Sequence, residues 1–124
     1  MTGIGHSFAL TRSVRGLCAA LMSPVAIVNI SSVAGIGALR GMTKLVAGQY
    51  GKDNIRANSM HPGFIETPMA TAAGEQRRLR EDMTMLRRIG QPREVAELVL
   101  FLASDASSCI TASEHLVDAG LMAE

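Results

Sequence analysis

Ser31 and Ser32 are the first residues in this sequence whose type and position suit chemistry, because they end a mainly apolar run at residues 25–30. A short continuous apolar run is typical of a strand that is buried on both faces. In open α/β sheets, ligands bind at the carboxyl ends of the strands. The two hydroxyls are therefore expected at an edge of a sheet where a ligand would bind.

A second candidate is the pair Pro62 and Gly63, which follows another run expected to form a strand. A tight Pro-Gly turn exposes backbone amides and lets a planar group approach the backbone closely. His61 precedes this turn and lies near the expected ligand cleft. Because His6, His61 and His115 share no metal-like spacing, we interpret them as packing or hydrogen-bonding residues and expect no metal site.

Tyr50 and Lys44 are candidates for proton transfer. A tyrosine, with an unperturbed pKa of about 10, needs a nearby cation to exchange a proton at neutral pH. Tyr50 is the only tyrosine in the chain, and the residue one helical turn after it is Asn54 rather than a lysine. Arg40 stands one turn before Lys44. We therefore expect Tyr50 to be a packing or surface residue and Lys44 to be an exposed helix cation.

These candidates need a sheet whose strands end at one edge, and the hydrophobic periodicity predicts such a sheet. In chain order we expect a helix at about 2–21, a strand at 25–30, a helix at 38–50, a strand at 55–59, a polar helix or mobile lid at 70–88, a helix that starts at 90–92 and a strand at 115–118. Strands that alternate with helices in this way pair in parallel.

The composition is that of a single globular domain. The 124 residues are 48% hydrophobic and 19% charged, which is enough apolar material for a core. The formal net charge of +1 gives no argument for a polyanionic partner, and the basic run at 77–80 is followed directly by Glu81 and Asp82. We interpret that run as a solvated helix face and expect no nucleic-acid partner.

The cellular setting is suggested by the apolar runs and the cysteines. The run at 16–30 is split by Ser23 and Pro24 and is too short to span a bilayer, so we expect no membrane partner. Cys18 and Cys109 stand alone, without metal-ligand spacing, which suits a reducing compartment. We expect a cytoplasmic protein.

Five segments of the chain together resemble the C-terminal half of a short-chain dehydrogenase/reductase. They are IVNISSVAG at 27–35, ALRGMTK at 38–44, IRANSMHPGFIETPM at 55–69, GQPREVAELVLFLASDASSCIT at 90–111 and HLVDAG at 115–120. They cover most of the chain in the family's order. The resemblance implies a partial Rossmann-like, doubly wound α/β fold with about three parallel strands and flanking helices, formed by residues 1–124 as a single truncated domain.

The resemblance also implies roles for particular residues. In that family, the serine at the position of Ser32 hydrogen-bonds the carbonyl or hydroxyl of the substrate, a small alcohol or ketone. The residues at the positions of Pro62, Gly63, Ile65 and Thr67 hold the nicotinamide carboxamide and a nearby phosphate of NAD or NADP. The implied reaction is hydride transfer between that cofactor and the substrate.

Three parts of the family's site are expected to have no counterpart in the sequence: the Tyr-x-x-x-Lys pair, the glycine-rich turn and the active-site asparagine, whose position would fall just before Met1. Roughly a dozen residues that would carry a Tyr-x-x-x-Lys pair are absent between the serines and the helix at 38–50. We interpret Gly35 and Gly37 as the seam of this gap, although they also resemble a stretched dinucleotide fingerprint. The family's glycine-rich turn for the pyrophosphate belongs to the preceding half of the fold, and the glycines at 3 and 5 follow no expected strand. We expect the isolated chain to be inactive.

An alternative function is therefore considered beside the NAD(P)-dependent oxidoreductase. Three strands without their usual neighbours leave a bare sheet edge and uncovered apolar helix faces. Such surfaces favour a homo-oligomer or pairing with a full-length relative, so the chain would act as an interaction module. A truncated product without a function is the third interpretation.

Overall fold

The computed structural model describes residues 24–68 and 74–123. These residues form the strands β1 (Val25–Ile30), β2 (Ile55–Pro62) and β3 (Glu114–Val117) and the helices α2 (Ile36–Tyr50), α3 (Glu75–Asp82) and α4 (Pro92–Ala103). Short 3-10 turns lie at Val33–Gly35, Gly51–Asp53 and Asp105–Ser107. The helix expected at about 2–21 and the first part of the lid expected at 70–88 lie outside the described residues.

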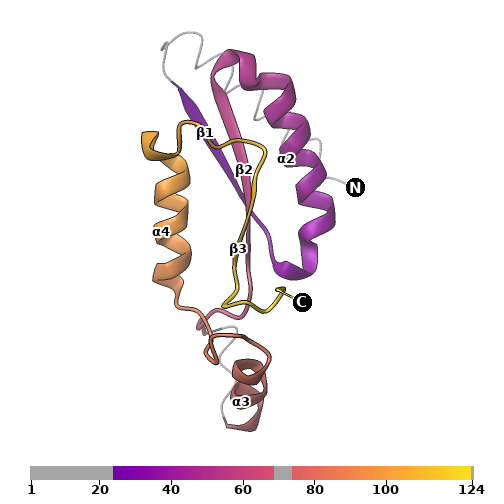
Figure 1. Ribbon diagram of the computed structural model, residues 1–124, viewed down its shortest axis with the longest axis vertical. Coiled ribbons are helices and arrows are strands. Elements are labelled where there is room, and N and C mark those ends of the chain that lie inside the picture. Colours follow the sequence, from indigo (N-terminus) through magenta and orange to yellow (C-terminus); the bar gives the residue numbers. More distant parts are fainter. Residues whose placement is uncertain (1–23, 69–73, 124) are drawn as a thin grey trace.

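The described strands form one parallel sheet in the order β1-β2-β3 (Figure 1). β1 pairs with β2 over its whole length, and residues 59–62 of β2 pair with β3. β2 is therefore the central strand, and most of its residues are buried. Because all the strands run in the same direction, their carboxyl ends lie at one edge, the lower one in Figure 1. We call this edge the carboxyl edge.

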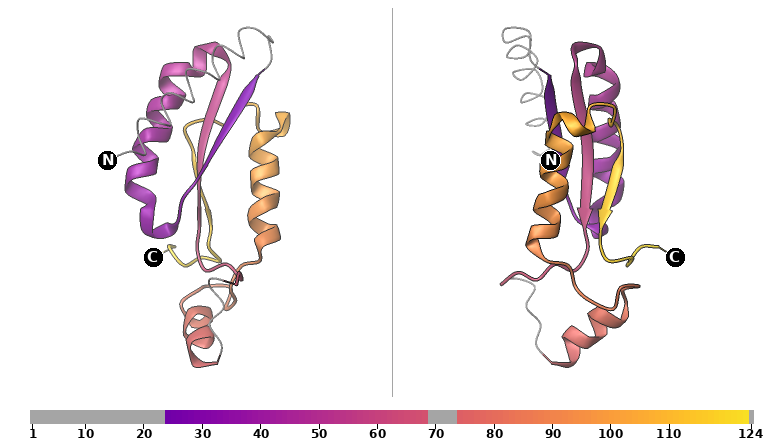
Figure 2. Two further views of the ribbon diagram at one scale, coloured as in Figure 1. Left: turned by 180° about the vertical axis from the view of Figure 1, so that it is seen from behind. Right: turned by 60° about the vertical axis from the view of Figure 1, so that its left-hand side comes forward.

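α2 and α4 cover opposite faces of this sheet, with the strands between them (Figure 2). Ile27 and Ala57 are paired neighbours on β1 and β2, and both belong to or pack against the apolar cluster that includes Val46 of α2. Successive residues of a strand point to opposite faces, so Arg56 points away from α2. Its guanidinium accordingly donates to the carbonyl of Leu102 in α4 (3.0 Å). The expected doubly wound α/β arrangement of parallel strands with flanking helices is confirmed.

The buried apolar core lies between α2 and the sheet. Val46, Ala47 and Tyr50 of α2 pack there against Ile55 and Ala57 of β2. Tyr50 is only 4% exposed, so the expectation that it is a packing residue is confirmed. A buried aromatic ring at this place stabilises the fold and is removed from the carboxyl edge, because α2 runs back along the strands and ends at Tyr50.

The start of α4 follows the rules for helix termini. Gln91 is the N-cap of α4. Its backbone N–H donates a hydrogen bond to the carboxylate of Glu94 (2.7 Å), which completes a capping box. Pro92 occupies the first turn, where its missing N–H costs no hydrogen bond. The predicted start of this helix is therefore confirmed.

β1 has the predicted bounds, whereas α2 and β2 differ from the predicted ones by a few residues. α2 begins at Ile36, ahead of the predicted residue 38, because the turn Val33–Gly35 leads directly into it. β2 continues beyond residue 59 to Pro62, because these residues pair with β3, a partner distant in sequence.

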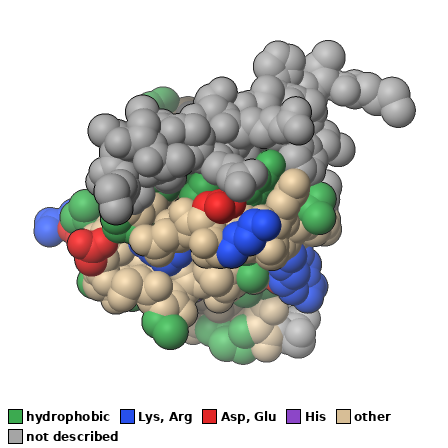
Figure 3. Space-filling model, turned by 90° about the horizontal axis from the view of Figure 1, so that it is seen from above, with side chains coloured by type: hydrophobic (Ala, Val, Ile, Leu, Met, Phe, Trp, Pro, Cys, Tyr) green, Lys and Arg blue, Asp and Glu red, His purple; other side chains and the backbone are tan. Residues whose placement is uncertain are grey.

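The surface carries a mixture of side-chain types. Seen from the end at which β1 and β2 begin, apolar, acidic and basic side chains are interspersed on the coloured part of the molecule (Figure 3). Among the described helices, none combines the length and the apolar character needed to cross a membrane.

Candidate functional site at the carboxyl edge

Ser32 lies just beyond the end of β1, at the carboxyl edge. The backbone N–H of Ser31 still donates to the carbonyl of Met60 on β2 (3.0 Å), so the chain leaves the sheet only after this bond. The Ser32 side chain is exposed, and its Oγ accepts a bond from the backbone N–H of Ala34 (3.3 Å). This hydrogen bond gives the backbone N–H of Ala34 a partner at the start of the following 3-10 turn. Because Ser32 Oγ is the acceptor, its hydroxyl proton is available to a ligand.

The Pro62-Gly63 turn lies at the end of β2, at the same edge. The N–H of Gly63 donates to the carbonyl of Val117 at the end of β3 (3.1 Å). A Cβ atom on Gly63 would lie 2.7 Å from the Cβ of Asp118, which is closer than real Cβ atoms approach other atoms. Glycine is thus required here because β2 and β3 end in direct backbone contact.

The residues after this turn are held by a second backbone partner. Ile65 forms a parallel bridge with Gly90, which precedes α4. Gly90 donates to the carbonyl of Phe64, and Glu66 donates to the carbonyl of Gly90, each over 2.8 Å. Residues 62–67, which we call the 62–67 loop, are therefore fixed between β3 and the start of α4. Thr67, at its end, is partly buried.

A cavity of about 440 Å³ lies beside this loop, on its β3 side. Ten residues line it: Met85, Leu86, Arg88, Gly90, Glu94, Leu116, Val117, Asp118, Ala119 and Gly120. Neither Ser32 nor Thr67 is among them. The carboxyl edge thus brings Ser32 and the 62–67 loop together at one end of the sheet, while this cavity is a separate feature of the same end.

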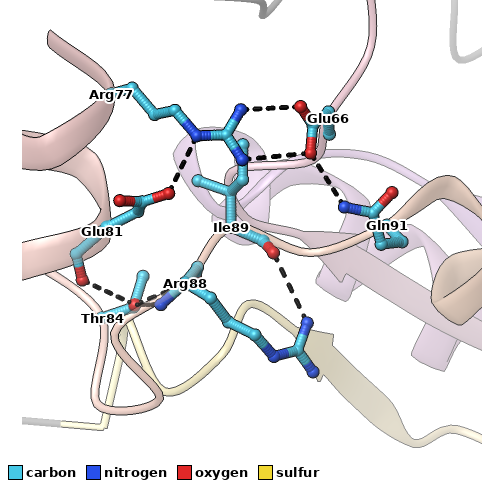
Figure 4. Close-up of polar contacts among 7 residues, drawn as sticks. All are labelled: Glu66, Arg77, Glu81, Thr84, Arg88, Ile89 and Gln91. Carbon is cyan, nitrogen blue, oxygen red and sulfur yellow. Dashed lines mark hydrogen bonds and ion pairs between the residues drawn. The ribbon is translucent and has the colours of Figure 1, made fainter. Parts of the chain in front are cut away.

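A cluster of charged side chains fastens α3 to the 62–67 loop (Figure 4). Arg77 donates to both carboxylate oxygens of Glu66, over 2.6 and 3.2 Å, and its Nε donates to Glu81 (2.9 Å). Gln91 donates to Glu66 from the other side (2.9 Å). We call Glu66, Arg77 and Gln91 the Glu66 clamp. Its hydrogen bonds from Arg77, and then from Gln91, lower the pKa of Glu66 from 4.5 to about 2.

A second ion pair joins the segment between α3 and α4 to the first turn of α4. Arg88 donates to both oxygens of Glu94, over 2.8 and 2.6 Å, and lowers the pKa of Glu94 to about 2 together with the N–H of Gln91. Thr84 is buried, and its hydroxyl bridges the carbonyls of Glu81 and Arg88. The Arg88–Glu94 pair therefore joins the segment after α3 to the first turn of α4, and the contacts of Thr84 with Glu81 and Arg88 are drawn in Figure 4.

The basic run at 77–80 lies in α3, which has no buried residue, as expected for a solvated helix face, and it also contacts the 62–67 loop. Arg77 belongs to the clamp, and the guanidinium of Arg80 lies 5.4 Å from the ring centroid of Phe64. Two of the three arginines of the run therefore contact the 62–67 loop. These contacts could not be predicted from the run itself, because the partners, Phe64 and Glu66, belong to a different segment.

His61 takes the hydrogen-bonding and packing role that was expected, while His6 lies outside the described residues. His61 is completely buried, and its Nε2 shares a hydrogen bond with the Ser59 hydroxyl (3.1 Å). Burial lowers the pKa of His115 in β3. In the described part of the chain, no group of three or more His, Cys, Asp or Glu side chains could hold a metal ion.

Lys44 is close to what the sequence suggested. It is about half exposed on α2, and its Nζ lies 3.3 Å from Glu114, which also pairs with Arg40 (2.8 Å). These ion pairs tie α2 to the start of β3. Lys44 is therefore a helix cation with a structural partner, and no tyrosine stands beside it in sequence.

The amino-acid sequence is similar to a known protein family and to several characterised oxidoreductases. The family model described as "Enoyl-(Acyl carrier protein) reductase" matches residues 29–122. The chain is 38% identical to the cyclohexanol dehydrogenase of Acinetobacter sp. (strain SE19) over 115 residues, which are 92% of this chain and 42% of that protein. It is 42% identical to the 3-oxoacyl-[acyl-carrier-protein] reductase of Thermotoga maritima, over 77% of this chain and 45% of that protein.

A solved structure has the same fold. The 4-hydroxyisoleucine dehydrogenase complexed with NADH superimposes with a TM-score of 0.84 at 30% identity, over 95% of this chain and 55% of that one. The chain thus spans less than half the length of the two curated relatives it matches here.

Proposed function

The chain belongs to the short-chain dehydrogenase/reductase family, and from this premise we propose that it carries the nicotinamide and substrate half of an NAD(P)-dependent oxidoreductase site. The observation that supports this most is the shared position of Ser32 and the 62–67 loop at the carboxyl edge of one parallel sheet. In open α/β sheets this edge is where ligands bind. Ser32, Pro62, Gly63, Ile65 and Thr67 are the residues to which we assign the site.

The described residues fit the nicotinamide end of the cofactor. A planar ring needs a rigid loop with backbone atoms close to it, and the 62–67 loop is fixed by backbone bonds to Val117 and Gly90. NAD or NADP, when bound, supplies a nicotinamide ring that accepts or donates the hydride. Thr67 and Ile65 orient that ring, and the exposed Ser32 hydroxyl donates to the substrate oxygen.

The substrate class that we propose is a secondary alcohol or its ketone. The relatives include a cyclohexanol dehydrogenase, cyclopentanol dehydrogenases and 3-alpha-(or 20-beta)-hydroxysteroid dehydrogenases, whose names describe such alcohols. A single hydroxyl donor such as Ser32 matches a single carbonyl or alcohol oxygen. The exposed position of Ser32 leaves that oxygen room to approach.

We propose that the isolated chain binds the nicotinamide end of the cofactor but does not catalyse the oxidation or reduction of a substrate. The sequence holds no Tyr-x-x-x-Lys pair, and its one tyrosine is buried in the core. Loss of a general acid–base group costs about 10²- to 10⁴-fold in rate. The family's glycine-rich turn belongs to the half of the fold that these residues do not span, so the proposal assigns no contacts to the adenosine and pyrophosphate of a dinucleotide. Complete activity needs both parts to be supplied from elsewhere.

Titration calorimetry tests this proposal, with reduced nicotinamide mononucleotide, NADH and NADPH compared on the full chain. We expect all three to bind with similar, millimolar dissociation constants, because the site holds only their common end. Cyclohexanol with NAD is expected to give no turnover above the buffer rate. Micromolar binding of NADH together with much weaker binding of the mononucleotide contradicts the half-site, and measurable turnover contradicts the inactivity.

A second candidate function, an interaction module, is favoured by the exposed apolar side chains. Ile30 at the end of β1, Leu45 on α2, and Leu100 and Phe101 on α4 are between 40% and 67% exposed. Exposed apolar residues on several elements are typical of surfaces that another chain covers. A homo-oligomer or a complex with a full-length relative would cover them. Size-exclusion chromatography with light scattering tests the interaction module. A stable monomer that does not bind an added full-length relative contradicts this function.

A further inference from the structure

Glu66 holds three separate segments of the chain with one carboxylate. It belongs to the 62–67 loop, accepts two bonds from Arg77 of α3, and accepts a third from Gln91 at the N-cap of α4. We infer that Glu66 is a positioning residue, whose clamp couples α3 to the 62–67 loop so that the two move as one unit. This inference rests on the proposed function, in which that loop orients the nicotinamide ring.

The clamp is more sheltered than the ion pair between Arg93 and Glu97 on the surface of α4. The side chains of Glu66 and Arg77 are each 35% exposed, whereas those of Arg93 and Glu97 on α4 are 87% and 60% exposed. Water and salt screen exposed pairs strongly, and a bidentate pair fixes geometry better than a single contact. The clamp therefore holds a defined arrangement, while the pair on α4 is a surface contact.

A second contact joins the same two elements. Arg77 and Arg80 are three residues apart in α3, so they lie on one face of that helix. Arg77 binds the Glu66 carboxylate, and the Arg80 guanidinium lies over the ring of Phe64 at 5.4 Å from its centroid. α3 thus contacts the loop at Phe64 and at Glu66. These two residues alternate in sequence with Ile65 and Thr67, to which the proposed function assigns the nicotinamide.

Backbone hydrogen bonds connect the Glu66 clamp to the residues of the proposed nicotinamide site. The N–H of Glu66 donates to the carbonyl of Gly90, whose own N–H donates to Phe64. Gln91, the next residue after Gly90, donates from its side chain to Glu66. One side-chain hydrogen bond and two backbone hydrogen bonds therefore join Phe64 and Glu66 to Gly90 and Gln91. When the carboxylate loses its charge, the loop loses a restraint immediately before Thr67.

Hydrogen exchange measured by mass spectrometry tests the coupling on the full chain. Glu66→Gln removes the charge and keeps the shape, and Glu97→Gln makes the same change at the exposed pair on α4, as a matched control. We expect Glu66→Gln to speed exchange about three- to tenfold both in α3 and at residues 63–67, because charge-assisted bonds are lost. Glu97→Gln is expected to leave both regions unchanged.

The pattern across variants decides the inference. Arg77→Gln is expected to loosen the same two regions, and α3 more strongly, because the Arg77–Glu81 pair is lost as well. At residues 63–67 the double variant with Glu66→Gln is expected to loosen the backbone by less than the sum of the two single changes, because both remove the Glu66–Arg77 pair. Faster exchange in α3 alone overturns the coupling, as does no change in either region. An equal increase in the buried strand β2 overturns it too, because the effect is then global.

A binding measurement separates this inference from the proposed function. The wild-type chain, Glu66→Gln and Glu97→Gln are titrated with reduced nicotinamide mononucleotide. Weaker binding by Glu66→Gln alone, about threefold or more, supports the positioning role. If the wild-type chain does not bind the mononucleotide, the proposed function fails while the exchange result still decides the coupling. Equal binding by all three proteins overturns the positioning role.

Discussion

Gly63 and Asp118 meet where β2 and β3 end, and their backbones are so close that a Cβ on Gly63 would lie 2.7 Å from the Cβ and 2.8 Å from the Cα of Asp118. Asp118 is itself fixed, since its carboxylate accepts bonds from the N–H groups of Gly120 and Met122, each over 2.9 Å. Neither the backbone at Gly63 nor Asp118 can move away without breaking hydrogen bonds. The shape of the carboxyl edge therefore depends on a glycine at position 63.

Gly63→Ala is expected to destabilise the fold by about 1–3 kcal/mol, because the added methyl group overlaps fixed backbone and side-chain atoms. The matched control is Gly48→Ala in α2, where an added Cβ meets nothing within 4 Å. That change is expected to stabilise the protein by about 0.5–1 kcal/mol, as alanine favours helix. Urea unfolding followed by circular dichroism measures both, and equal effects of the two changes would show that the contact is absent.

Tyr50 provides a test of core packing against chemistry. Tyr50→Ala is expected to cost about 3–5 kcal/mol, because it leaves a cavity beside Val46 and Ile55. Tyr50→Phe keeps the ring and removes the only tyrosine hydroxyl in the chain. If Tyr50 has no chemical role, Tyr50→Phe leaves the affinity for reduced nicotinamide mononucleotide unchanged. A large loss of that affinity in a folded Tyr50→Phe protein would contradict the assignment.

The carboxylates of Glu66 and Glu94 give a prediction for pH. The pKa values of Glu66 and Glu94 are both lowered from 4.5 to about 2 in the folded protein. A lowered folded pKa means that the ion pairs contribute their full stability above about pH 4.5 and lose it as the pH falls through about 2. Carbon-13 NMR of the side-chain carboxyl groups measures both values directly.

The control for this titration is Arg77→Gln. Because Arg77 is the largest cause of the lowered pKa of Glu66, the variant should return the Glu66 pKa toward 4.5. Glu94 is held by Arg88 and by the N–H of Gln91, so its pKa should stay near 2. Two carboxyl groups that titrate together near pH 4.5 in the wild-type protein would contradict both ion pairs.

Local patterns in the sequence were sufficient for most of the fold. The apolar run at residues 25–30 gave β1 its bounds, and Pro92 with Glu94 marked the start of α4, because the signals lie within one turn of the ends they determine. The packing role of Tyr50 followed in the same way from the absence of a cation one turn later. The fold class followed from the alternation of strands and helices.

The contacts between distant segments could not be predicted in this way. β2 extends to Pro62 because of pairing with β3, and the arginines at 77 and 80 bind the loop around Phe64 and Glu66. A charge run has the same appearance whether it is solvated or paired. The only available signal was that an isolated acid, Glu66, follows the Pro62-Gly63 turn, and its partner cannot be identified from spacing.

The assignment of one ligand site to Ser32 and Thr67 is the claim on which the proposed function depends. Its most direct test is to follow the backbone amide signals of the nitrogen-15-labelled chain by NMR while reduced nicotinamide mononucleotide is added. We expect the amides of Ser32 and Thr67 to shift together with one millimolar dissociation constant. Shifts confined to the cavity around Met85 and Leu116, or no shift at saturating ligand, would contradict the shared site.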